Sequence, residues 1–164
     1  MALTRIGRDV DFEDFSWHDC HLWGLALGVG DPDRGDWSSD LILDIDYILE
    51  WVCGVGSAPA RFRVAPADLA FHDVTDLTID LAWPDAGGQV AVSLPSIDAI
   101  ARERVADQRV HLDRPYYRWE IRFNWPAGGA IRFSATGFTQ TLRAAPALLE
   151  QQHLGRGERR PGGG

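Results

Sequence analysis

One eleven-residue stretch constrains the fold of this chain more than any other feature of the sequence. From Leu41 to Trp51, apolar residues alternate with a more polar set at a period of two. Because successive side chains of a β-strand point to opposite faces, this pattern predicts a central strand with one apolar face and one face that bears three carboxylates. The apolar positions are Leu41, Leu43, Ile45, Tyr47, Leu49 and Trp51, and the carboxylates are Asp44, Asp46 and Glu50.

Other segments show alternation, or short apolar runs bounded by turn residues. Together with the central strand, the predicted strands cover residues 19–29, 41–51, 61–64, 78–83, 89–94, 117–125 and 131–136. The Pro and Gly turns at 84–88 and 126–129 predict that the strands on either side of each turn pair as a hairpin. Residues 95–105 fit helical and strand spacing equally well, and Leu142–Leu149 has room for a short helix.

This succession of short strands favours an antiparallel β-sandwich or open barrel with at most one or two short helices. A parallel α/β sheet would need helices of about 10 to 15 residues between its strands, and the sequence shows no such pattern. We expect a single β domain over residues 1–150. We expect residues 151–164 to form a flexible tail, because they are rich in Gly and Arg and have little apolar surface to bury.

The charge of the chain is uneven. Residues 1–100 hold 18 acidic and 5 basic residues, a net charge of −13, whereas residues 101–164 carry a net charge of +5. The overall charge of −8 disfavours a nucleic-acid partner, because phosphate binding needs a basic face. Neither a long apolar run nor a signal-peptide pattern is present, so we expect a cytoplasmic protein without a membrane partner.

Two histidine–aspartate segments are candidates for a metal or ligand site. The first holds His18, Asp19 and His21, and the second holds His72 and Asp73. Because alternate residues of an extended chain point in opposite directions, neither segment alone offers three convergent ligands. A metal-dependent hydrolase or small-ligand binder therefore requires the two segments to meet. The alternative is that Asp19 and His21 form a hydrogen-bonded pair and that Asp73 forms a turn.

The acidic face of the central strand is a candidate partner-binding surface. The Cβ atoms of Asp44 and Asp46 should lie about 6.5 to 7 Å apart, a separation that also permits an acid and base pair. Glu50 extends the same face. The structural alternative is a ladder of ion pairs with Arg118 and Arg122, which alternate in the same way on a later strand.

The common catalytic and nucleotide-binding motifs are missing from the sequence. It contains no GxSxG segment, no Walker-type glycine loop and no GxGxxG after a predicted strand, so we expect no cofactor. Cys20 and Cys53 are too few for a disulfide framework and are expected to be buried free thiols.

The segment FSWHDCHLWGLAL, from Phe15 to Leu27, together with the hairpins near the end of the chain, resembles small bacterial immunity-type β proteins of toxin–immunity systems. The segments LDIDYILEW, FHDVTDL and LDRPYYRWEIRFNWP resemble signatures of an uncharacterised bacterial family. The resemblance implies a small β protein and transfers no functional residue.

These observations favour a non-enzymatic module whose acidic surface binds a basic protein partner, such as a toxin or nuclease domain. Two alternatives stay open. One is the metal-dependent hydrolase or small-ligand binder, and the other is a structural subunit that buries some of its seven tryptophans in a homodimer interface.

Overall fold

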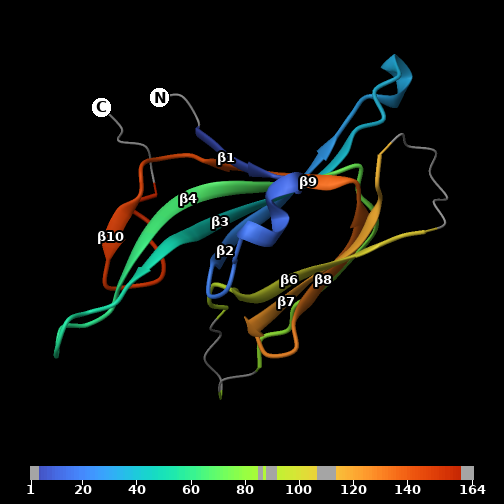
Figure 1. Ribbon diagram of the computed structural model, residues 1–164. Coiled ribbons are helices and arrows are strands. Elements are labelled where there is room, and N and C mark those ends of the chain that lie inside the picture. The colour runs from blue at the N-terminus through green and yellow to red at the C-terminus, as the bar shows by residue number, and fades with distance from the viewer. Residues whose placement is uncertain (1–3, 85–86, 88–91, 107–113, 160–164) are drawn as a thin grey trace.

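The computed structural model describes residues 4–84, 87, 92–106 and 114–159. These residues form ten strands of one antiparallel sheet in the order β1-β9-β4-β3-β2-β6-β7-β8-β5, with β10 paired to β4 (Figure 1). The mainly antiparallel β fold is confirmed, whereas a sandwich or an open barrel is not shown. The strands are β1 Thr4–Arg8, β2 His21–Val29, β3 Ser39–Val52, β4 Arg61–His72, β5 Thr75–Asp80, β6 Ser96–Arg104, β7 Tyr117–Trp125, β8 Ala130–Ala135, β9 Gly137–Leu142 and β10 Ala147–Leu149.

Helical structure is limited to two short 3-10 segments in the described part of the chain. These are η1, Asp9–Asp14, and η2, Pro32–Arg34. No helix among the described residues is long and apolar enough to cross a membrane.

Strand β3 contains the alternating stretch and pairs with β2 on one side and β4 on the other. Leu41, Leu43 and Ile45 are fully buried, as the alternation predicts. We call the side of the sheet that carries these residues the inner face, and the side that carries Asp44 the outer face. Apolar side chains fill the inner face, and charged side chains gather on the outer face.

The alternation of β3 breaks near its end. The pairing with β4 shifts between Ile48 and Glu50, so Leu49 is the extra residue of a β-bulge. Beyond the bulge, Trp51 stands opposite Phe62 on the outer face, and Glu50 moves to the other side. The predictions that Leu49 and Trp51 are buried, and that Glu50 shares the face of the other carboxylates, are therefore wrong.

An aromatic core lies on the inner face. Trp119 of β7 and Phe133 of β8 are buried, and their ring centroids lie 5.0 and 4.7 Å from that of Phe71 on β4. Figure 1 shows β6, β7 and β8 below β2, β3 and β4 in this view, and these rings bring the two groups of strands into contact. Phe12 of η1 and Phe138 of β9 join the same cluster. The predicted hairpin of β7 and β8 is confirmed.

Some local predictions fail because strands choose distant partners. Strand β5 pairs with β8. Of its predicted hairpin partner, residues 89–94, positions 89–91 lie outside the described residues and 92–94 form no strand. The ambiguous residues 95–105 contain strand β6, which pairs with β7. The segment Leu142–Leu149, which has room for a short helix, forms none, because β10 instead extends along Phe62–Val64.

The two cysteines differ in exposure. Cys20 is buried and Cys53 is exposed, and both are free. Burial raises the pKa of the Cys20 thiol to about 12, so this thiol is unreactive at neutral pH. The predicted burial is thus confirmed for Cys20 and wrong for Cys53, which lies in the loop after β3.

Candidate functional site

The two histidine–aspartate segments lie at different ends of the sheet. His21 begins β2 and stands opposite Asp46 of β3, whereas Nδ1 of His72, at the end of β4, lies 3.2 Å from Oδ1 of Asp40. Asp40 and Asp46 are six positions apart on one strand, which corresponds to about 20 Å. The segments therefore do not meet. Among the residues that the structure describes, no three metal-ligating side chains form a group.

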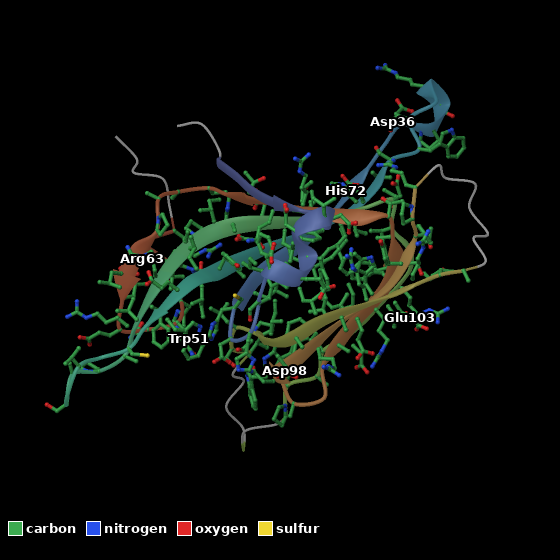
Figure 2. All side chains as sticks on the ribbon, in the orientation of Figure 1. Asp36, Trp51, Arg63, His72, Asp98 and Glu103 are labelled. Atoms are coloured by element: carbon green, nitrogen blue, oxygen red, sulfur yellow. The ribbon has the colours of Figure 1, made fainter. Side chains whose placement is uncertain are left out.

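The first segment makes structural contacts at the start of β2. Nδ1 of His18 lies 3.0 Å from the carbonyl oxygen of Asp98, which is labelled in Figure 2. The carboxylate of Asp19 accepts hydrogen bonds from Nδ2 of Asn124 at 2.8 Å and from Nε2 of Gln152 at 2.9 Å. These bonds join the loop before β2 to β7 and to the segment after β10.

The second segment, at the labelled position of His72 in Figure 2, is likewise held by its neighbours. Nε2 of His72 lies 2.9 Å from Oγ1 of Thr139 on β9. Asp73 has a left-handed backbone with φ of 55°, which fits the predicted turn, and its carboxylate accepts a hydrogen bond from Oγ1 of Thr136 at 2.7 Å. His72 thereby ties β4 to β9, and Asp73 ties the turn after β4 to the connection between β8 and β9.

Charged side chains converge on the outer face of β3. Asp44 and Asp46 share this face, and Asp68 of β4 stands opposite Asp44. Arg143, just after β9, and Arg159 bring their guanidinium groups to these carboxylates. The acidic cluster, as we call it, consists of Trp23, Asp44, Asp46, Asp68, Arg143 and Arg159.

The predicted ladder of Asp44 and Asp46 with Arg118 and Arg122 is wrong. Strand β7, which carries both arginines, is separated from β3 by β2 and β6 in the sheet order. Arg122 lies 4.0 Å from Glu120 on its own strand instead. Matching alternation on two strands therefore did not mean that the strands were neighbours.

Asp46 is the most deeply buried member of the acidic cluster. Its carboxylate accepts hydrogen bonds from Nε1 of Trp23 and from the backbone N–H of Leu154, both at 2.8 Å, and from the guanidinium of Arg159. Trp23 reaches Asp46 because it is the extra residue of a bulge in β2. A buried carboxylate needs such partners, since an uncompensated buried charge is strongly unfavourable.

Asp44 and Asp68 form the more accessible side of the acidic cluster. The guanidinium of Arg143 pairs with Asp44, and its Nε lies 3.3 Å from Oδ1 of Asp68. Partial burial raises the pKa of Asp68, and the charge of Arg143 opposes this rise. One arginine thus bridges carboxylates on two adjacent strands.

Arg159 comes from the part of the chain that was expected to be a flexible tail. Its side chain is 8 % exposed, pairs with Asp44 and Asp46, and lies over the Trp23 ring with 4.8 Å between the guanidinium carbon and the ring centroid. Burial lowers the pKa of Arg159, and the charge of Asp44 opposes this shift. Leu154 is buried in the same segment, so residues 154–159 lie against the outer face.

Glu50 lies apart from the acidic cluster. Its carboxylate accepts a bond from Nε of Arg63 at 3.0 Å, and both side chains are exposed. Figure 2 labels Arg63 and Trp51 near the far end of the β3–β4 pair. Of the three partner-binding candidates, the structure brings two together and separates the third.

His21 shares the outer face with Asp46, and its ring centroid lies 4.8 Å from that of His153. Burial lowers the pKa of His21 below its ordinary value of 6.5, and the charge of His153 lowers it further. The contribution of neutral His21 to stability is therefore present above pH 6.5 and is lost as the pH falls toward the lowered pKa.

We expect proton NMR titration of the His21 ring to give a midpoint below 6.5. The variant His153→Asn should raise that midpoint partway, because the burial of His21 persists when the neighbouring charge is removed. A His21 midpoint that His153→Asn leaves unchanged would show that the two rings do not interact.

Sequence reasoning missed Trp23, Asp68, Arg143 and Arg159. The bulge that turns Trp23 toward Asp46 has no local signal in the sequence. Asp68 does interrupt an apolar stretch between Ala67 and Leu69, and this interruption was a usable signal for a carboxylate on the outer face. Arg143 and Arg159 are distant in sequence from β3. The only sequence signal for them was the opposite net charge of residues 1–100 and residues 101–164, which indicates that basic side chains from the second part could pair with the acidic ones of the first.

Comparison with known proteins adds no assignment to this geometry: no family model, no curated protein and no solved structure matches the chain.

Proposed function

We propose that this chain is a non-enzymatic protein-binding module that receives an arginine side chain of a basic partner in the acidic cluster. The observation that carries the proposal is the position of Arg159, whose guanidinium lies between two carboxylates and the face of Trp23. The chain thereby supplies, from its own end segment, the chemical group that such a site would bind.

The chemistry of the acidic cluster suits a guanidinium better than an ammonium. Asp44 and Asp46 present carboxylates to the two terminal nitrogens of one planar group. A guanidinium has several N–H donors in a fixed plane and stacks on aromatic rings, whereas a lysine ammonium is a compact point charge. The indole of Trp23 adds a cation–π contact on the remaining side.

In this proposal Arg159 is a tethered competitor. A partner arginine has to displace it, and the net charge of −13 on residues 1–100 favours the approach of a basic partner. Residues 155–158 form a turn closed by a backbone hydrogen bond from Glu158 to Gly155. Displacement of Arg159 would therefore require a short segment to move while the strands stay paired.

The test is chemical rescue of the variant Arg159→Ala. Addition of N-methylguanidinium should raise the thermal midpoint of this variant, because a ligand that binds the folded state stabilises it; at ten times its dissociation constant the gain is about 1.4 kcal/mol. Methylammonium at the same concentration serves as the matched cation. A second arm measures binding of an arginine-containing peptide to the full chain and to Arg159→Ala, with the lysine version of the peptide as control.

The expected results are rescue by the guanidinium compound alone and tighter binding of the arginine peptide to Arg159→Ala than to the full chain. Asp44→Asn should weaken peptide binding. This variant is preferable to a change at Asp46, because Asp46 is fully buried and its loss would also affect folding. Equal effects of guanidinium and ammonium, with no preference for the arginine peptide, would mean that Arg159 is a structural clamp and would refute the proposal.

A further inference from the structure

Among the described residues, strand β2 has an open edge over its outer half. It pairs with β3 from His21 to Val29, interrupted by the bulge at Trp23, but on its other side it pairs with β6 at a single position, His21 with Ser96. Figure 1 shows the β2–β3 hairpin projecting beyond the other strands, with η2 at its tip. The outer half of β2 is thus bonded on one side among the described residues.

The hydrogen-bonding pattern identifies the free backbone groups. In an antiparallel pair, alternate residues bond to the partner strand. The N–H of Gly30 bonds to the carbonyl of Ser38, so even-numbered residues of this hairpin face β3. Leu25, Leu27 and Val29 therefore direct their N–H and C=O groups to the open edge.

The side chains of the same three residues are apolar and exposed. Leu25 stands opposite Leu43, and Leu27 stands opposite Leu41, so they lie on the inner-face side of the sheet. The exposed fractions of Leu25, Leu27 and Val29 nevertheless rise from 39 % to 58 % and 77 %, because the hairpin extends beyond the core. This edge carries no proline and no charged residue between Trp23 and Val29, although such residues normally protect free edges.

An apolar groove continues from this edge. It has a volume of about 440 Å³ and is lined by residues 22–25 of β2, by Leu81 and Trp83, and by residues 92–95. A strand added to the edge of β2 would reach this groove at its end. Backbone pairing and apolar contact are therefore both available on the same side of β2.

We infer that β2 of a second copy of this chain pairs antiparallel with this edge, with Leu27 of each copy on the two-fold axis. In this register Leu27 pairs with Leu27, and Leu25 pairs with Val29. All three outward-facing residues of one copy then meet outward-facing residues of the other, so every free donor finds an acceptor. The six aliphatic side chains lie on one face and cover one another, because directly opposed residues of paired strands point the same way.

A second copy fits better than an unrelated segment, because the edge is complementary to itself. A two-fold interface requires one surface to match its own copy, and residues 25, 27 and 29 do so in both hydrogen bonding and side-chain character. The turn after Val29 of the second copy would then approach the groove beside Trp23. The result is a continuous sheet in which β1-β9-β4-β3-β2 of one copy meets the same five strands of the other.

The first test measures mass by sedimentation from about 1 to about 500 μM, because a ladder this short is smaller than a standard interface of roughly 800 Å² per partner and should dissociate on dilution. The wild-type chain should change from monomer to dimer across this range. Leu27→Lys should shift the midpoint at least tenfold toward higher concentration, since it places two like charges at the axis. Val55→Lys, at a position that is 91 % exposed in the β3–β4 loop, is the matched control and should leave the midpoint unchanged.

The second test is disulfide trapping in a Cys53→Ser background, which removes the exposed native thiol. Leu27→Cys should form a dimer on mild oxidation, because Cα atoms of a hydrogen-bonded pair lie about 5.5 Å apart, within the range for a disulfide. Ala26→Cys should not form a dimer, because in this register residue 26 does not stand opposite residue 26 of the other copy. A wild-type chain that is monomeric over the whole range, or trapping that is equal at 26 and 27, would overturn the inference and assign the edge to another occupant or register.

Discussion

Replacing Arg159 with alanine is expected to lower the free energy of unfolding by about 3 kcal/mol, the lower end of the range for breaking a buried ion pair. The variant leaves the fully buried Asp46 without its guanidinium partner. The hydrogen bonds from Trp23 and from the Leu154 backbone would persist, so the loss should not reach the upper end of that range. Urea denaturation followed by tryptophan fluorescence and circular dichroism would measure the change.

A matched control for this loss is Arg156→Ala. Arg156 is exposed in the same segment, and its replacement should change stability by less than about 0.5 kcal/mol. Adding Asp46→Asn to Arg159→Ala should recover part of the loss, because it removes the charge that Arg159 compensates. If Arg159→Ala and Arg156→Ala had the same small effect, residues 154–159 would not be held against the outer face in solution.

The second large effect is expected at Trp119, where alanine should lower the free energy of unfolding by about 3 to 5 kcal/mol. Trp119 is fully buried on β7, and the rings that surround it come from separate parts of the chain. Its ring centroid lies 5.4 Å from Phe12 and 5.0 Å from Phe71, and its ring is stacked with Phe133 at 6.3 Å. The truncation therefore opens a cavity that no single strand can close.

The control for Trp119→Ala is Trp37→Ala, which removes the same side chain from a position that is 77 % exposed. Chemical denaturation of both variants should show a large decrease for Trp119→Ala and a change below about 0.5 kcal/mol for Trp37→Ala. A loss below about 1 kcal/mol at Trp119 would contradict the close packing of rings described for the inner face.

Much of the strand content was predictable, because alternation is a local property. Leu41, Leu43 and Ile45 are buried as predicted, and the hairpin of β7 and β8 forms around the expected turn. Both predictions rest on residues close together in sequence, and the physical cause is the opposite direction of successive side chains. The same reasoning failed at Leu49, where an extra residue in the strand reverses the pattern.

Strand order and the acidic cluster were not predictable in this way. Arg118 and Arg122 match the alternation of the acidic residues of β3, yet two strands intervene. Arg159 is 113 residues away from Asp46 and lies in a segment without any strand pattern. The alternation of apolar and polar residues indicates which residues share one face of a strand. It carries no information about which distant segment covers that face.

The place of β9 in the sheet has a consequence for synthesis of the chain. This strand, Gly137–Leu142, inserts between β1 and β4, which lie more than 60 residues earlier in the sequence. During translation the edge of β4 from Ala67 to His72 lacks its native partner until β9 has left the ribosome, because those are the positions that β9 occupies. Such non-local pairing slows folding and exposes an apolar edge to nascent neighbours. The nascent chain is therefore expected to depend on chaperones during the interval between the emergence of β4 and that of β9.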